Sequence, residues 1–113
     1  KEKFYLQEVP AGYKSAWAQY SIRPKDSNRD YYLKLLKDNN IPSVIYYPKP
    51  LHLQKVFSKL DFGEKELPKS EKVSRYIMSI PFSPFLSEYE QRMVVDTLLG
   101  AWSNTNKHHF GIY

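Results

Sequence analysis

The chain has 113 residues, 42% of them apolar and 26% charged, and 17 Lys and Arg against 12 Asp and Glu give a formal charge of +5. This length fits one domain, and the absence of cysteine excludes a disulfide scaffold, a thiol nucleophile and a Cys-ligated zinc site. No apolar run approaches the roughly 20 residues of a membrane span, and Lys1-Glu2-Lys3-Phe4 does not open a signal peptide, which predicts a soluble cytoplasmic protein without a membrane segment.

The N-terminal part of the chain predicts one strand behind an irregular arm. Residues 1–15 contain Pro10 and Gly12 and no sustained period, so we interpret them as an arm or linker. Residues 16–22 alternate in polarity and are rich in aromatic and β-branched side chains, which favours a strand. Arg23-Pro24 should end this strand, because proline cannot donate to a ladder.

A helix followed by a second strand is predicted next. Ser27 and Asp30 have the spacing of a capping box, and apolar residues then recur at helical spacing through residues 27–38. Asn39-Asn40 can close the last turn. Residues 41–46 are typical of a short β-rich strand, so the order is strand, helix, strand.

The middle of the chain is broken by prolines. Residues 47–50 hold two prolines in three positions and cannot be regular structure, whereas the apolar spacing of residues 51–60 suggests a short helix. After a polar loop at 61–66, Pro68 is well placed to begin a helix that runs to Arg75 or Tyr76. Residues 77–80 should then form a strand.

The C-terminal part has the clearest helical pattern. Ser87 and Glu90 form a second capping box, followed by one apolar stripe that reaches Gly100-Ala101. Residues 102–113 are polar with scattered aromatic side chains and predict a loosely held tail.

Most common catalytic signatures are missing. The three histidines, His52, His108 and His109, lack the spacing of a metal site. No nucleophile elbow, Gly-rich phosphate loop or dinucleotide fingerprint is present. The sequence does not exclude the paired carboxylates of a glycosidase, although its acidic residues resemble ordinary helix-start and loop residues.

The segment Tyr46-Tyr47-Pro48-Lys49-Pro50-Leu51-His52 concentrates functional side chains on a stiff bend. Two phenols, an ammonium and an imidazole suit hydrogen bonding to hydroxyls or phosphates, and a rigid bend needs no reorganisation to present them. The alternative is a surface loop whose tyrosines cap the core, with His52 at a helix start.

The basic charge leaves a second class of function open. The Lys and Arg residues are dispersed among acidic ones, which favours a solvated mixed-charge surface over a nucleic-acid face. A nonenzymatic, basic, Tyr-rich binding module for nucleic acid or protein is the competing hypothesis. A further alternative is an assembly domain that uses the aromatic termini.

Three segments, in order and with compatible gaps, resemble the sugar aminotransferases of the DegT/DnrJ/StrS family. They are Asn40 to His52, Leu67 to Ser74 and Ile77 to Ser87. The resemblance implies the C-terminal small domain of that family, with residues 1–15 as arm, 16–101 as domain and 102–113 as tail. The implied fold class is α/β, as an α+β two-layer unit with a small, mostly antiparallel sheet and helices packed on it.

The same resemblance implies an activity for a larger parent protein. Members are pyridoxal-phosphate (PLP) dependent homodimers that transfer the amino group of glutamate to a keto group on a nucleotide-linked sugar, in polysaccharide or antibiotic sugar synthesis. The family's Schiff-base lysine lies in a large domain to which nothing here matches. We therefore expect this chain to be a piece of a longer protein that, alone, neither holds PLP covalently nor transaminates.

Site residues follow from the resemblance position by position. It implies substrate contacts from Tyr46, Tyr47, Lys49 and His52, with Tyr47 and His52 as ligands of hydroxyls or phosphates. It implies that Pro48, Pro50, Pro81 and Phe82 shape the adjacent wall. No residue is expected to be catalytic or to ligate a metal.

Overall fold

A computed structural model describes residues 2–60 and 63–101 of the chain. The expected tail at 102–113, with His108 and His109, lies outside the described residues. Within these ranges, no helix is long and apolar enough to cross a membrane.

The centre of the molecule is a three-stranded antiparallel sheet in the order β1-β2-β3. It comprises β1 (Phe4–Tyr5), β2 (Tyr20–Pro24) and β3 (Met78–Ile80). Tyr20 pairs with Ile80 and Ile22 with Met78, while Phe4 pairs with Pro24 at the other edge of β2. The small antiparallel sheet of the predicted α+β fold is thereby confirmed.

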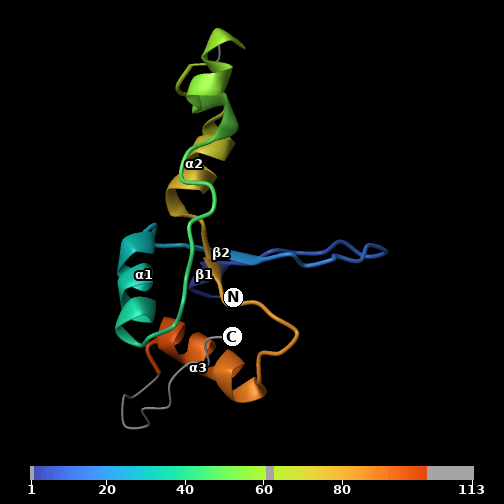
Figure 1. The fold of residues 1–113 in the computed structure, drawn as a ribbon, viewed down its shortest axis with the longest axis vertical. Coiled ribbons are helices and arrows are strands. Elements are labelled where there is room, and N and C mark those ends of the chain that lie inside the picture. The colour runs from blue at the N-terminus through green and yellow to red at the C-terminus, as the bar shows by residue number, and fades with distance from the viewer. Residues whose placement is uncertain (1, 61–62, 102–113) are drawn as a thin grey trace.

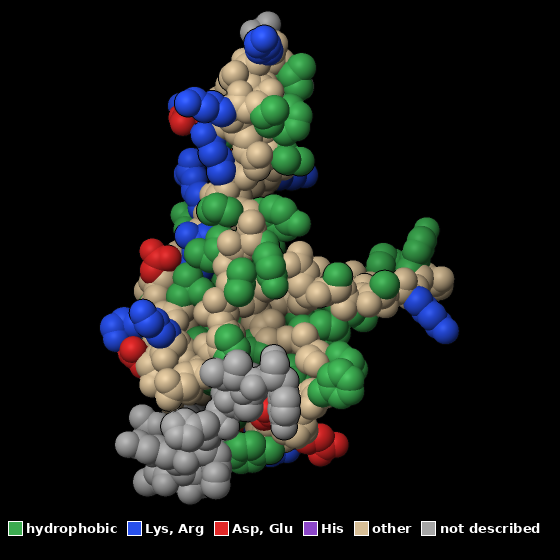
Figure 2. Space-filling view, viewed as in Figure 1, with side chains coloured by type: hydrophobic (Ala, Val, Ile, Leu, Met, Phe, Trp, Pro, Cys, Tyr) green, Lys and Arg blue, Asp and Glu red, His purple; other side chains and the backbone are tan. Residues whose placement is uncertain are grey.

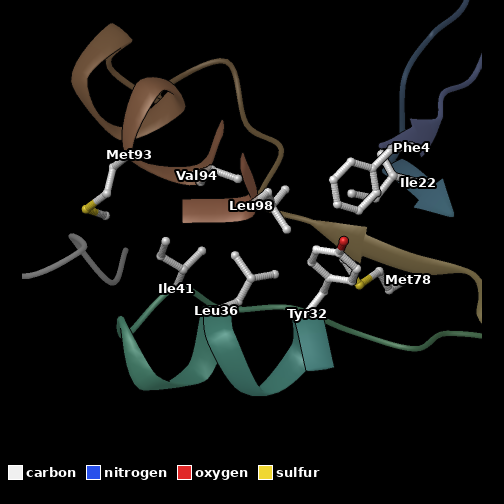
Figure 3. Packing of buried hydrophobic residues seen from close by; sticks show 9 residues of the cluster. All are labelled: Phe4, Ile22, Tyr32, Leu36, Ile41, Met78, Met93, Val94 and Leu98. Atoms are coloured by element: carbon white, nitrogen blue, oxygen red, sulfur yellow. The ribbon is translucent and has the colours of Figure 1, made fainter. Parts of the chain in front are cut away.

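Two helices bury their apolar stripes against this sheet and each other. They are α1 (Arg29–Asp38) and α3 (Glu88–Leu99), which lie on the same side of the sheet (Figure 1). The buried apolar side chains come from both helices, from all three strands and from the residue that follows the turn after α1, as Figure 3 shows: Phe4, Ile22, Tyr32, Leu36, Ile41, Met78, Met93, Val94 and Leu98. One shared core therefore holds these elements together.

One further helix lies in a part of the chain that projects away from this core (Figure 1). It consists of α2 (Pro68–Tyr76) with the 3₁₀ segments η1 (Leu51–Leu53) and η2 (Lys55–Leu60). Figure 2 shows lysines and arginines along one side of this projection and apolar side chains along the other. Arg29 joins the projection to α1, because its Nη1 donates to the Ser74 carbonyl at 3.1 Å.

The strand expected at residues 16–22 begins only at Tyr20 and continues through Pro24, so its predicted bounds were wrong. Trp17 has a φ of 47°, which is incompatible with an extended strand. Pro24 is tolerated at the end of β2. Residues 1–15, expected to be an arm or linker, include β1 and the core residue Phe4, while the connection from β1 to β2 extends outward (Figure 1).

Only one of the two predicted capping boxes forms. Ser87 accepts the Glu90 amide at 3.2 Å, and the Glu90 carboxylate accepts the Ser87 amide at 2.8 Å, as predicted. Ser27 instead has a φ of 60°, and no side chain caps α1. Asp26 forms a turn before the helix, in which its carboxylate accepts the Asn28 amide at 3.0 Å.

Two further predictions were wrong in detail. Residues 41–46 contribute a single bridge, Val44 to Ser79, rather than a strand. The Ile41 amide is used to close α1 by donating to the Leu36 carbonyl at 2.9 Å, with Asn40 at a φ of 56°. The helix expected over 51–60 is two 3₁₀ segments, because the backbone of Gln54 is extended.

Candidate functional site

The bend at residues 46–52 is held at both ends and open along its middle. Before it, Val44 exchanges two backbone hydrogen bonds with Ser79 at 3.0 and 2.8 Å. After it, the Leu53 amide donates to the Pro50 carbonyl at 3.1 Å. The tyrosines between these anchors are exposed, Tyr46 by 54% and Tyr47 by 64%, and so is Lys49. Their polar ends are thus free to reach a ligand.

A cavity of about 710 Å³ opens beside the bend, between it and α2. We call it the bend cavity. Tyr47, Pro50 and His52 line it from the bend, and Lys69 and Ser70 line it from the first turn of α2. Its walls are mostly apolar with a few polar groups, which is typical of small-molecule sites. The structure therefore brings three of the sequence-predicted residues around one hollow.

Three of the other predicted residues lie at a second, smaller hollow. Tyr46 shares a hollow of about 190 Å³ with Pro81 and Phe82. The Phe82 ring stacks on Tyr20 at a centroid distance of 6.2 Å and lies 6.3 Å from Trp17, so it is part of an aromatic cluster. Pro48 and Lys49 line neither hollow. The rings of Tyr46, at the smaller hollow, and Tyr47, at the bend cavity, are neighbours with centroids 6.4 Å apart.

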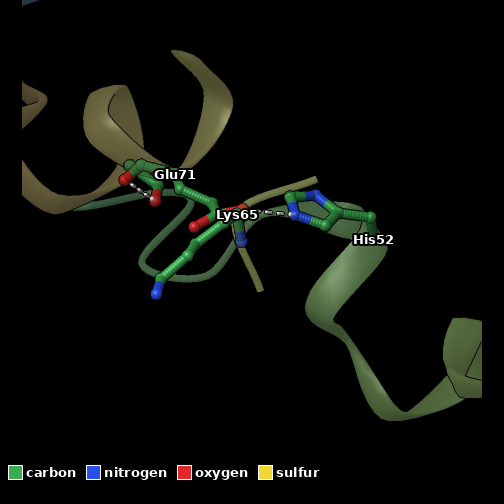
Figure 4. A network of polar contacts seen from close by, with 4 residues as sticks. His52, Lys65 and Glu71 are labelled. Carbon is green, nitrogen blue, oxygen red and sulfur yellow. Dashed lines mark hydrogen bonds and ion pairs between the residues drawn. The ribbon is translucent and has the colours of Figure 1, made fainter. Parts of the chain in front are cut away.

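The imidazole of His52 is buried and has an internal partner. Its Nε2 lies 3.2 Å from Glu71 Oε1, and the same oxygen accepts the Lys65 backbone amide at 2.8 Å (Figure 4). His52 and Glu71 are 8% and 6% exposed. The prediction treated His52 as an open ligand, whereas the structure ties one ring nitrogen to α2.

Glu71 is the residue that reasoning on the isolated bend missed. Nineteen residues separate it from His52, so no local spacing predicts the pair. The signal available was the matched segment Leu67 to Ser74, which contains it. Among the described residues, no group of three or more His, Cys, Asp or Glu is placed to hold a metal ion.

Glu71 should make stability depend on pH. Burial alone would raise the pKa of its carboxyl, but hydrogen bonds from His52 and from the Lys65 and Leu67 amides outweigh that effect and hold this pKa below its ordinary value. A depressed folded-state pKa adds stability above the unfolded-state value of about 4.3, and that stability is lost as pH falls through the folded value. We expect the difference in Tm between the native protein and Glu71→Gln to shrink below about pH 4.

Thermal melts across pH check this expectation, with Glu66→Gln as the matched control. Glu66 is exposed on the neighbouring loop, so its variant should track the native protein at every pH. A Tm difference for Glu71→Gln that stays constant down to pH 2 would contradict the expectation.

Comparison with known proteins places this geometry in context. The sequence model of the DegT/DnrJ/EryC1/StrS aminotransferase family matches residues 1–99. A "Pleiotropic regulatory protein" of Geobacillus stearothermophilus is 43% identical over 71% of this chain and 21% of its own length. A "UDP-N-acetyl-3-dehydro-alpha-D-glucosamine 3-aminotranferase" of Acidithiobacillus ferrooxidans is 35% identical over 74% of this chain and 21% of its own.

A solved structure is also similar. The crystal structure of a DegT DnrJ EryC1 StrS aminotransferase from Brucella abortus superposes with a TM-score of 0.79 and is 42% identical. The match covers 88% of this chain and 26% of that chain. The chain spans about a fifth of the length of the curated relatives it matches.

Proposed function

Because the chain belongs to the DegT/DnrJ/EryC1/StrS aminotransferase family, we propose that it is the small, substrate-closing domain of a PLP-dependent sugar aminotransferase. The whole protein would transfer the amino group of glutamate to a keto group on a nucleotide-linked sugar. The observation that carries the proposal is the proline-braced bend, which exposes two phenols beside a cavity of about 710 Å³. The named relative that acts on a UDP-linked sugar supports this substrate class.

Each polar group on the bend has a distinct task in this proposal. The phenols of Tyr46 and Tyr47 donate to phosphate or sugar oxygens, since charge-assisted hydrogen bonds to phosphate are short and strong. Lys49 is exposed and adds a positive charge for the diphosphate. His52 contributes the part of its ring that lines the bend cavity. Pro48 and Pro50 keep the bend stiff, and Pro81 with Phe82 forms the wall beside Tyr46.

The described residues do not fit a complete PLP site. A lysine that forms a Schiff base works in a desolvated pocket, whereas every lysine of the described ranges is exposed. PLP, which supplies the electron sink for amino transfer, would therefore be held by other parts of the whole protein. The isolated chain would be inactive, and the whole protein would be a cytoplasmic homodimer.

Transamination assays test the function. The whole protein, incubated with glutamate and a UDP- or dTDP-linked keto sugar, should release 2-oxoglutarate and show the absorbance of bound PLP. Residues 1–113 alone should release none. A whole protein without PLP absorbance and without 2-oxoglutarate release, or turnover by the isolated chain, would contradict the proposal.

A further inference from the structure

The bend has little support of its own between its two anchors. Its middle residues, Tyr46 to Lys49, are all exposed, and its first anchor is the single bridge between Val44 and Ser79. The second anchor is the turn in which the Leu53 amide donates to the Pro50 carbonyl, and this turn contains His52, the one buried residue of the bend. What holds His52 therefore helps to set the position of the exposed phenols, together with the Val44–Ser79 bridge and the two prolines.

Glu71 holds this second anchor from a different element. One of its carboxylate oxygens accepts both the Lys65 amide and His52 Nε2, at 2.8 and 3.2 Å. The contact joins three parts of the projection: η1 through His52, the loop before α2 through Lys65, and α2 itself (Figure 4). A carboxylate cannot donate, so the neutral His52 ring must carry its proton on Nε2.

The other ring nitrogen is left available by this arrangement. Among the described residues, no hydrogen-bond partner lies at Nδ1 of His52. His52 lines the bend cavity, and in the neutral ring an unprotonated Nδ1 is the acceptor that this side chain can offer to a hydroxyl there.

We propose that Glu71 is a positioning residue, which holds Nε2 of His52 and thereby presets both the tyrosine bend and the acceptor Nδ1 for a sugar hydroxyl. The inference rests on the proposed function and assigns it a residue that makes no substrate contact itself. Preset geometry matters because a displacement of about 1 Å can cost up to 100-fold in rate.

The ring tautomer is the first test and needs no variant. Long-range ¹H–¹⁵N NMR of the native protein should show the neutral His52 ring protonated at Nε2 and bare at Nδ1. A neutral ring protonated at Nδ1 would overturn the proposal, because Nε2 could then not donate to Glu71.

The second test separates positioning from general stability. In the whole protein with a UDP- or dTDP-linked keto sugar, Glu71→Ala should raise KM about tenfold and change kcat less. Glu71→Gln keeps the acceptor oxygen, so its KM should lie close to the native value. Glu66→Gln should have the KM and kcat of the native enzyme. A folded Glu71→Ala protein with native KM would overturn the proposal.

The outcomes also distinguish this inference from the function it rests on. If the native protein turns over no nucleotide-linked sugar, the proposed function is wrong. The tautomer of the His52 ring then still shows whether Nε2 donates to Glu71. Native turnover that Glu71→Ala leaves intact defeats the positioning role alone. If Glu71→Ala does not fold, the tautomer of the native protein decides.

Discussion

Leu36→Ala should lower the free energy of unfolding by about 2–5 kcal/mol. Leu36 is 0% exposed and lies where α1 meets α3 and the sheet (Figure 3). Its truncation leaves a cavity between α1, α3 and the sheet, and the packing of these elements against one another limits how far they can close it. Because domains of this size are stable by only about 5–15 kcal/mol, the variant should lose much of its stability. Urea unfolding followed by circular dichroism measures the change.

Lys37→Ala is the matched control for this prediction. Lys37 is the next residue of α1 and points to solvent, so its truncation should change stability by less than about 0.5 kcal/mol. Equal midpoints for Leu36→Ala and the native protein would contradict the account of the core.

Tyr47→Phe should lower kcat/KM of the whole protein for a nucleotide-linked sugar by about 10- to 100-fold. The variant keeps the ring and removes only the hydroxyl, and a hydrogen bond to a charged group is worth about 1.5–3 kcal/mol. Steady-state kinetics with UDP- and dTDP-linked keto sugars measure the loss. We expect most of it in KM, since the phenol binds the substrate rather than the reacting carbon.

Tyr31→Phe controls for the loss of a tyrosine hydroxyl. Tyr31 is 53% exposed on α1 and lines none of the hollows beside the bend, so this variant should keep native kinetics. Unchanged kinetics in Tyr47→Phe would reject this residue as a substrate ligand while leaving the family membership intact.

The helices of this fold could be predicted from residue patterns because their causes are local. The capping box of Ser87, the proline at the start of α2 and the apolar stripes of α1 and α3 each act within a few residues. The same pattern failed at Ser27, because this residue has a φ of 60° in a turn where Asp26 accepts the Asn28 amide, and α1 then begins without a side-chain cap. Local spacing does not reveal such a turn.

The strands were harder to bound, because pairing between distant segments decides them. Val44 has a partner only where Ser79 passes beside it, and Phe4 joins the sheet only because β2 continues to Pro24. The β-rich pattern of residues 41–46 could not show that only Val44 would form a bridge.

The site was predicted in one half only. Prolines and phenols marked the bend at residues 46–52, since stiffness and polar groups are both visible in the sequence. The bend cavity and the partner of His52 could not be predicted from the bend, because α2 supplies them from about twenty residues further along the chain. Tertiary packing thus buries and orients His52, for which the isolated bend predicts an open side chain.

A structure of the whole protein with a bound UDP- or dTDP-linked sugar tests the central claim most directly. The account predicts that the phenol oxygen of Tyr46 or Tyr47 lies within about 3 Å of a phosphate or sugar oxygen, with the ligand beside the bend cavity. A nucleotide-linked sugar bound in the same protein without contact to any residue from 46 to 52 would contradict it.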